Sequence, residues 1–231
     1  FLVIVNRSKM VYICLLPTIF YIIFKKRKRY ILVAILICLG GYFALPNSIT
    51  DRLQYIVNYE KDPSSNLRVI FWKTGLEAFK QKPVLGWQWE DRKDFNLRYY
   101  KKIGVSEYVH ENFLDRLSEW PIYYVHTHST YLQFLLDFGI VGILFLVIFF
   151  VSTFMKAASI NFSKNKENID SRLVALEIGT KAALAAWAIQ GITDINLNNK
   201  YMIITSVILL FLLNYLWKEK IKLEKGKGEN E

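Results

Sequence analysis

Long apolar blocks are the feature that most constrains how this chain can fold. Soluble domains disperse apolar residues at helix or strand spacing, whereas blocks near 20 residues are typical of membrane spans. Of the 231 residues, 53% are hydrophobic and 22% are charged, and the apolar residues gather in blocks around one polar stretch, 47–127. The sequence therefore predicts an integral membrane protein and excludes a disordered chain or a secreted disulfide scaffold.

Five apolar segments are long enough to be considered as spans. In hydrocarbon, every backbone N–H and C=O must be satisfied within its own segment, so we expect helices. The predicted fold class is all-α: a polytopic membrane helix bundle of five spans with a large, partly helical extracytoplasmic loop. The segments are Ser8–Phe24, Ile31–Pro46, Ser129–Phe154, Val174–Thr193 and Tyr201–Trp217.

The short connections predict the orientation of these spans. Lys25–Arg29 holds five basic residues and no acid, and the 156–172 connection and the 218–231 tail are also basic, whereas the 194–200 loop carries only Lys200. The positive-inside rule then places 25–30, 156–172 and 218–231 in the cytoplasm and 47–127 outside. Because the net charge of +10 lies at the edges of the apolar blocks, we expect membrane lipids and no nucleic acid as partners.

The expected domain organisation follows from this topology. Residues 1–46 form two spans with a cytoplasmic basic loop, 47–127 the extracytoplasmic loop, 128–217 three spans, and 218–231 a cytoplasmic basic tail. Phe1–Val5 resembles the tail of an earlier apolar segment, with neither a charged start nor a cleavage site, so we expect the C-terminal part of a longer protein. Cys14 and Cys38 fall inside apolar blocks and are interpreted as small buried hydrophobes.

The outer stretch contains one clear helical pattern, at about 64–82. Val69, Trp72, Leu76 and Phe79 recur at helical steps, with a start signal at 62–65 and a stop at 82–83. Such a helix could lie flat in the membrane interface on its apolar face, or pack inside an outer domain. The carboxylates of the WEDRKD sequence, 89–94, are interpreted as surface charges rather than metal ligands.

The histidines are the candidates for chemistry. A zinc site from His110, His126 and His128 would need further fixed ligands, so no metal is expected. His128 lies where the third predicted span begins, with Thr127 and Ser129 available as caps. The N–H groups and positive dipole end of a helix disfavour the imidazolium, and a neutral imidazole can accept a proton as a general base.

Two blocks of residues form recognisable motifs. Arg68 and Trp72, followed by residues 82–87, form the pattern Arg…Trp…Pro-apolar-apolar-Gly-Trp, and His128, Ser129 and 139–142 form the pattern His, a small polar residue, nine positions and Gly-x-x-Gly. These blocks resemble the motifs of the O-antigen ligase and O-antigen polymerase superfamily of bacterial membrane glycosyltransferases, and a third stretch, Asn6-Arg7-Ser8, resembles another. Of Asn6-Arg7-Ser8, only the arginine matches the family's Ser-Arg-Gly, and Gln88 stands where a second glycine is frequent.

The resemblance implies an inverting, metal-independent and cofactor-free transfer of a glycan from an undecaprenyl-diphosphate carrier to an acceptor hydroxyl. The acceptor would be lipid A core, an equivalent lipid or a glycan, and the active site would face outward from the bacterial cytoplasmic membrane. By resemblance, Arg7 and Arg68 hold the diphosphate and His128 is the base. Sugar rings stack on aromatic faces, and polar groups on the outer side could contact the same substrate. The candidate substrate-binding residues are therefore Trp72, Trp87, His126 and Asp194.

Several alternatives stay open. A repeat-unit polymerase of the same superfamily would use the same donor and the same kind of base. A polysaccharide exporter or flippase would be expected to show internal repeats, and no repeat is visible in the sequence. A membrane anchor whose outer domain binds a partner would make His128 and Arg68 dispensable. Glu177 and Lys181 are interpreted as an i,i+4 pair near the cytoplasmic end of their span. Gly139 and Gly142 are interpreted as small residues that let neighbouring helices pack closely.

Overall fold

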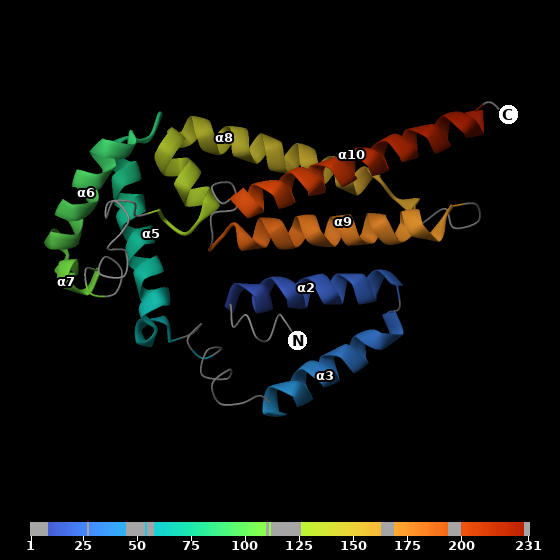
Figure 1. The fold of residues 1–231 in the computed structure, drawn as a ribbon, viewed down its shortest axis with the longest axis horizontal. Coiled ribbons are helices and arrows are strands. Elements are labelled where there is room, and N and C mark those ends of the chain that lie inside the picture. Colours follow the sequence, from blue (N-terminus) through green and yellow to red (C-terminus); the bar gives the residue numbers. More distant parts are fainter. Residues whose placement is uncertain are drawn as a thin grey trace. The chain divides into compact units, whose positions relative to one another are not determined.

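The computed structural model describes residues 9–26, 28–44, 54, 58–109, 111, 126–162, 169–193 and 200–228. Within these ranges all regular secondary structure is helical, as the all-α prediction requires. The chain divides into two compact units (Figure 1). Unit 1 comprises Phe1–Ala44, Ile148–Gln190 and Asn196–Glu231, and unit 2 comprises Leu45–Val147 and Gly191–Ile195.

Unit 1 contains long helices close to the positions predicted for spans. They are α2 (Lys9–Lys26), α3 (Ile31–Ala44), α9 (Ser171–Gln190), α10 (Lys200–Gly228) and the second part of α8 (Thr130–Ser159). Helix α9 lies against both α2 and α10 (Figure 1). Its Leu184 and Trp187 join Leu209, Leu213 and Leu216 of α10 in one apolar core. Helix α10 continues to Gly228, so most of the predicted basic tail is helical.

Two of the described helices are long and apolar enough to cross a membrane by length and composition, α8 and α9. Helix α3 has 14 residues, fewer than the roughly 20 that a span needs. Helix α2 has 18 residues but includes Lys9, Lys25 and Lys26. The topology of five crossings therefore stays a prediction.

The turn after α8 is fastened to α9 by a buried ion pair. The Nζ of Lys181 lies 2.6 Å from Oε1 of Glu177, whose side chain is 3% exposed. The other carboxylate oxygen of Glu177 accepts a hydrogen bond from the amide of Phe162 at 2.8 Å, and Lys181 donates to the carbonyl of Ile160. The predicted i,i+4 pair is confirmed, and it satisfies backbone groups just beyond the end of α8.

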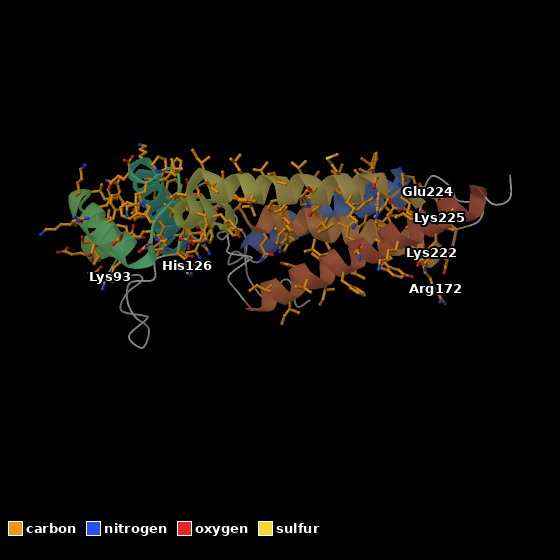
Figure 2. The ribbon with its side chains drawn as sticks, turned by 90° about the horizontal axis from the view of Figure 1, so that it is seen from above. Lys93, His126, Arg172, Lys222, Glu224 and Lys225 are labelled. Carbon is orange, nitrogen blue, oxygen red and sulfur yellow. The ribbon has the colours of Figure 1, made fainter. Side chains whose placement is uncertain are left out.

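Charged side chains gather at one end of unit 1. Figure 2 shows Arg172, at the start of α9, on the same side as Lys222, Glu224 and Lys225, near the end of α10. Helices α9 and α10 therefore run in opposite directions, and the basic ends of both meet. This arrangement is the one that the orientation predicted from the short connections requires.

Unit 2 is built on α5 (Pro63–Gln81), with α6 (Trp89–Lys102), the single turn α7 (Ser106–Val109) and the first part of α8. Asp62 caps α5: its side chain accepts a hydrogen bond from the amide of Ser65 at 2.9 Å, and Pro63 occupies the first turn. The helix ends before Pro83. These bounds differ by one residue from the helix predicted at 64–82.

The buried face of α5 is not the predicted one. Leu76, expected on the apolar face, is 49% exposed, and Val69, Trp72 and Phe79 are only partly buried. The buried residues are Leu67, Ile70, Phe71, Thr74, Gly75 and Ala78. The reason is close packing: a Cβ at Gly75 would lie 3.1 to 3.4 Å from side-chain atoms of Leu132 and Leu136, so the small residues of α5 face α8. The alternative in which the face of Val69, Trp72, Leu76 and Phe79 packs inside an outer domain is therefore wrong, because residue size selects the face that approaches α8. The alternative in which this face lies in the membrane interface stays a prediction.

Helix α8 is broken at Gly139, and the loop that follows α5 occupies the break. Gly139 has φ 63° and ψ −155°, a region open essentially to glycine alone, and the ribbon changes direction there (Figure 1). In a regular helix the amide of Ile140 would donate to the carbonyl of Leu136. Here it donates to the carbonyl of Pro83 at 2.8 Å, and the amide of Trp87 donates to Leu136 at 2.7 Å.

Two glycines make this exchange of partners possible. A Cβ on Gly139 would lie 2.2 Å from the carbonyl oxygen of Val84, and one on Gly86, which has φ 75°, would lie 2.5 Å from that of Leu136. Side chains at these positions would push the two backbones apart. The interpretation of Gly139 and Gly142 as helix-packing residues is wrong: Gly139 meets a loop, and a Cβ on Gly142 would meet Phe138 and Phe134 of its own helix.

Candidate functional site

The histidine loop, residues 126–129, lies along one face of α5. The indole N–H of Trp72 donates to the carbonyl of Thr127 at 2.8 Å. One residue earlier, the ring of Phe71 is stacked on that of His128, with centroids 6.1 Å apart and planes 12° apart. Arg68 lies one helical turn before Trp72 and so shares this face. The spacing Arg68-x3-Trp72 thus places the arginine and the anchor of the loop on the same side of one helix.

The loop brings two histidines together in a strained backbone. The rings of His126 and His128 meet edge to face, with centroids 4.1 Å apart. His128 has φ 49°, and among the described residues it is the one non-glycine with positive φ. Such a conformation costs of the order of 1–3 kcal/mol and persists where surrounding contacts impose it. Here Phe71 and the hydrogen bonds of Thr127 supply those contacts.

The start of α8 sits directly after His128. Ser129 accepts a hydrogen bond from the amide of Leu132 at 3.4 Å, which is the cap expected of it. Thr127 does not cap the helix; its hydroxyl donates to the carbonyl of Ser129 at 3.0 Å. The amide of Thr130 donates to the carbonyl of Gly191 at 2.8 Å, which joins the end of α9 to the same place.

A chain of polar contacts, which we name the polar relay, connects α6 to the histidine loop. Arg92 of α6, 3% exposed, forms an ion pair with Asp137 of α8. Asp137 accepts hydrogen bonds from the side-chain amide of Gln133 at 2.8 and 2.9 Å. The oxygen of that amide accepts from the backbone N–H of Thr127 at 3.1 Å. The buried charge of Arg92 is thus compensated, and the orientation of Gln133 is fixed by Asp137 on one side and Thr127 on the other.

Burial and neighbouring charge keep His128 neutral. Desolvation, the adjacent His126 and the guanidinium of Arg68 together lower the pKa of the His128 imidazole from its ordinary value to about 3. The effect of Arg68 places its charge within electrostatic reach of the ring. The prediction of a neutral imidazole at this position therefore has a physical cause in the structure: burial first, and then the charges of His126 and Arg68.

Arg68 has an N–H donor that no described residue uses. One terminal nitrogen donates to the hydroxyl of Ser64 at 2.8 Å and to its carbonyl at 3.3 Å. Its Nε is buried and bonds to no atom of the described residues. An arginine presents five N–H donors in a planar fork that fits phosphate or carboxylate oxygens. Arg68 can therefore bind an anion beside the histidine loop.

The other predicted site residues are placed differently. Trp87 is 8% exposed, packs with Ala78, Phe95 and Leu136, and donates its N–H to the carbonyl of Ala78 at 2.7 Å. It is therefore part of the core of unit 2, and its predicted contact with substrate stays a prediction. Arg7, His110 and Asp194 lie outside the described residues. No three potential metal ligands gather in the part of the chain that the structure describes.

Sequence reasoning missed the polar relay, because helix α6 was not predicted. Arg92, Phe95, Asn96 and Tyr100 are all buried and recur at steps of three, one and four residues. This is a helical face with a charge in it, and the pattern was available in the sequence. The charged residues of 90–94 were interpreted as surface charges, so the buried face of the same helix was not predicted. Gln133 and Asp137, four residues apart in α8, had no distinguishing pattern of their own.

Comparison with known proteins gives one family. A family model described as O-antigen ligase matches residues 1–147, which is more than half of the chain and includes both motif blocks. No curated protein and no solved structure matches.

Proposed function

We propose that this chain, which belongs to the O-antigen ligase family, transfers a glycan from an undecaprenyl-diphosphate carrier to an acceptor hydroxyl on the outer side of the cytoplasmic membrane. The observation that carries the proposal is the packing of the histidine loop on α5: Trp72, one turn after Arg68, holds the carbonyl of Thr127, and Phe71 is stacked on the ring of His128. An anion-binding side chain and an imidazole that burial keeps neutral thereby lie beside the same loop. Both residues belong to the two motif blocks by which the chain resembles its family. The site therefore has one group for a phosphate and one for a proton.

Arg68 would hold the diphosphate of the donor. Cleavage of the sugar–phosphate bond leaves negative charge on the departing diphosphate, and a guanidinium stabilises that charge while staying ionised. The unused Nε of Arg68 supplies a donor for this purpose. Arg7 is proposed as the second arginine on the same diphosphate.

His128 would act as the base. A nitrogen of its imidazole accepts the proton of the acceptor hydroxyl while the hydroxyl oxygen bonds to the anomeric carbon from the face opposite the diphosphate. The bond between that carbon and the phosphate oxygen breaks, its electron pair leaves with the diphosphate, and the configuration inverts. The transfer proceeds without a metal ion or cofactor.

The low pKa of His128 has a consequence for the order of events. With an empty site, an imidazole of pKa about 3 is neutral at pH 7 but is a weak base. A diphosphate bound at Arg68 offsets the positive charge beside the ring, and its own negative charge raises the pKa of the imidazole. Donor binding would therefore activate the base, and the acceptor would be deprotonated only when a donor is in place.

The residues that contact the acceptor are proposed from those that border the histidine loop. His126 contacts His128, and the ring of Trp72 is only partly buried although its N–H is used. These two, with Asp194, are the candidate contacts for sugar or acceptor. Lipid A core or an equivalent acceptor would make the protein a ligase, and a growing glycan would make it a repeat-unit polymerase with the same base and the same arginines.

The test is to replace His128 by alanine in the complete protein and to measure glycan transfer from the lipid carrier by the purified enzyme in bilayers. Loss of a general base is expected to lower the rate about 10²- to 10⁴-fold at equal expression. His110→Ala is the matched control and should transfer normally. Normal transfer by a well-expressed His128→Ala variant contradicts the assignment, and a purified wild-type protein that moves the carrier across the bilayer without transferring its glycan favours an exporter.

A further inference from the structure

The distribution of charge along α8 marks the depth at which the helix would leave the membrane. From Phe138 to Met155 the helix has no ionisable side chain; Asp137 precedes this stretch and Lys156 follows it. After the break at Gly139, the helical residues from Ile140 to Met155 span about 24 Å at 1.5 Å each, comparable to the hydrocarbon thickness of about 30 Å. The outer boundary of the hydrocarbon then lies at the break of α8.

The loop of residues 83–85 is fastened to α8 at this level. The carbonyl of Pro83 accepts from the amide of Ile140 at 2.8 Å, and the carbonyl of Val84 accepts from that of Val141 at 3.4 Å. Pro83 has no backbone N–H to satisfy. Two carbonyls of the loop are thus paired within the protein, which lowers the cost of placing irregular backbone near hydrocarbon.

The side chains of this loop and of the helix beside it form an exposed apolar surface, which we name the break patch. Leu85 is 76% exposed and Val84 is 60% exposed. The neighbouring α8 residues Phe138, Ile140 and Val141 are 53%, 44% and 39% exposed. One turn further, Leu144 and Phe145 continue the same kind of surface into the apolar stretch of α8. An exposed patch of this kind marks an interaction site.

The edge of the break patch is polar. Lys82 lies 3.0 Å from the carboxylate of Asp91 and over the ring of Trp87, 4.5 Å from its centroid. A lysine beside an apolar tip keeps its charge among headgroups while its stem covers apolar surface. The order along the chain, Lys82 and then Val84 and Leu85, is the one expected at a lipid interface.

We infer that residues 83–85 form an interfacial anchor, in which Val84 and Leu85 enter the outer leaflet beside Ile140 and Val141 and membrane lipid covers the break patch. The occupant follows from continuity, because the patch continues into the exposed apolar surface of α8, a helix that is long and apolar enough to cross a membrane. Since the loop is bonded to α8 at the break, the anchor also holds unit 2 at a fixed depth. The inference does not depend on the transfer chemistry.

Depth measurement with spin labels tests the anchor. Single cysteines are placed at Leu85, Val141, Phe145 and Lys101 in full-length protein with Cys14→Ala and Cys38→Ala, labelled, and reconstituted in bilayers. Oxygen, which concentrates in lipid, should relax the label at position 85 more than a water-soluble nickel complex does. The depth of the label at position 85 should match that of the label at position 141 within one helical turn and be shallower than that of the label at position 145. The label at position 101 should be relaxed more by the nickel complex than by oxygen.

Two results would overturn the anchor. A label at position 85 that behaves like the one at position 101 would place the loop in water. A label that neither reagent reaches would show that protein, from this chain or a second copy, covers the patch. As a measurement independent of labelling, Leu85→Asp should lower the melting temperature in bilayers by several degrees more than Leu97→Asp, which alters an exposed leucine of α6 outside the patch; equal effects would contradict the inference.

Discussion

Among the residues that the structure describes, each unit has an ion pair with one fully buried member, and the two pairs are connected differently. Glu177 and Lys181 of unit 1 belong to one helix and bind the backbone of the turn after α8. Arg92 and Asp137 of unit 2 belong to different helices, and Asp137 is bonded through Gln133 to the histidine loop. The first pair fastens the turn after α8 to α9. The second pair, through its hydrogen bonds, connects α6 and α8 to the loop that carries the proposed base.

The same contrast holds for glycine. Gly179 of unit 1 lies within a regular helix with open space around it, and Gly139 of unit 2 lies in a break where backbone meets backbone. Unit 1 thus depends mainly on apolar side chains along its helices, which tolerate small changes of shape. Unit 2 depends on a few contacts that only one conformation satisfies, as a site that must place a base requires.

The largest expected effect comes from alanine at the two glycines. Gly139→Ala forces a side chain into a conformation reserved for glycine and against the carbonyl of Val84, so we expect a loss of several kcal/mol in the stability of unit 2. Gly179→Ala should instead stabilise by about 0.5–1 kcal/mol, as in helix interiors generally. Thermal denaturation in bilayers measures the change in stability caused by each substitution. If both substitutions destabilise the protein, or both stabilise it, the contrast between the two glycines is wrong.

Substitutions in the two ion pairs should distinguish an effect on stability from an effect on glycan transfer. Asp137→Asn and Glu177→Gln each leave a buried positive charge without its partner, at a cost of about 3 kcal/mol. Only Asp137→Asn should lower kcat and change its pH profile, because only Asp137 fixes Gln133 and the histidine loop. Transfer is compared at matched amounts of folded protein. A Glu177→Gln variant with the same kinetic defect would mean that the polar relay has no special connection to the site.

A smaller effect is expected from Trp72→Phe. The change keeps an aromatic ring and removes the N–H that holds the carbonyl of Thr127, which is worth about 1 kcal/mol. Transfer should fall, because the loop that carries His128 is less well held, while KM for the donor changes little. Unchanged kcat with a raised KM would instead assign Trp72 to substrate binding.

The smallest effect is a pH dependence of stability. The pKa of His128 is lowered in the folded state, so the unfolded chain binds more protons between about pH 3 and 6.5. Stability from this residue is present above pH 6.5 and is lost as pH falls, by less than about 1 kcal/mol from pH 7.5 to 6. His128→Gln should remove this dependence in denaturation measured at both pH values. A slope that persists in the variant would assign the loss to other groups.

Much of this fold was predictable, because local chemistry specifies it. Apolar blocks place the long helices within a few residues, and Asp62, Pro63 and Pro83 give the start and end of α5. Arg68 and His128 were identified by their motifs, and their proximity follows from the packing of α5 against the loop. Helix α6 and the buried face of α5 were missed, since both depend on which residues are small enough to approach a neighbour.

The sequence alone determined where the long apolar helices lie, where α5 begins and ends, and the family to which the chain belongs. Each of these properties depends on neighbouring residues or on a fixed spacing. Only the tertiary structure decided that α8 breaks at Gly139, that residues 83–87 fill the break, and that Arg92 is connected to the histidine loop. The physical reason is that a backbone amide has the same hydrogen-bonding capacity everywhere, so its partner is selected by packing between distant segments and leaves no pattern in the sequence.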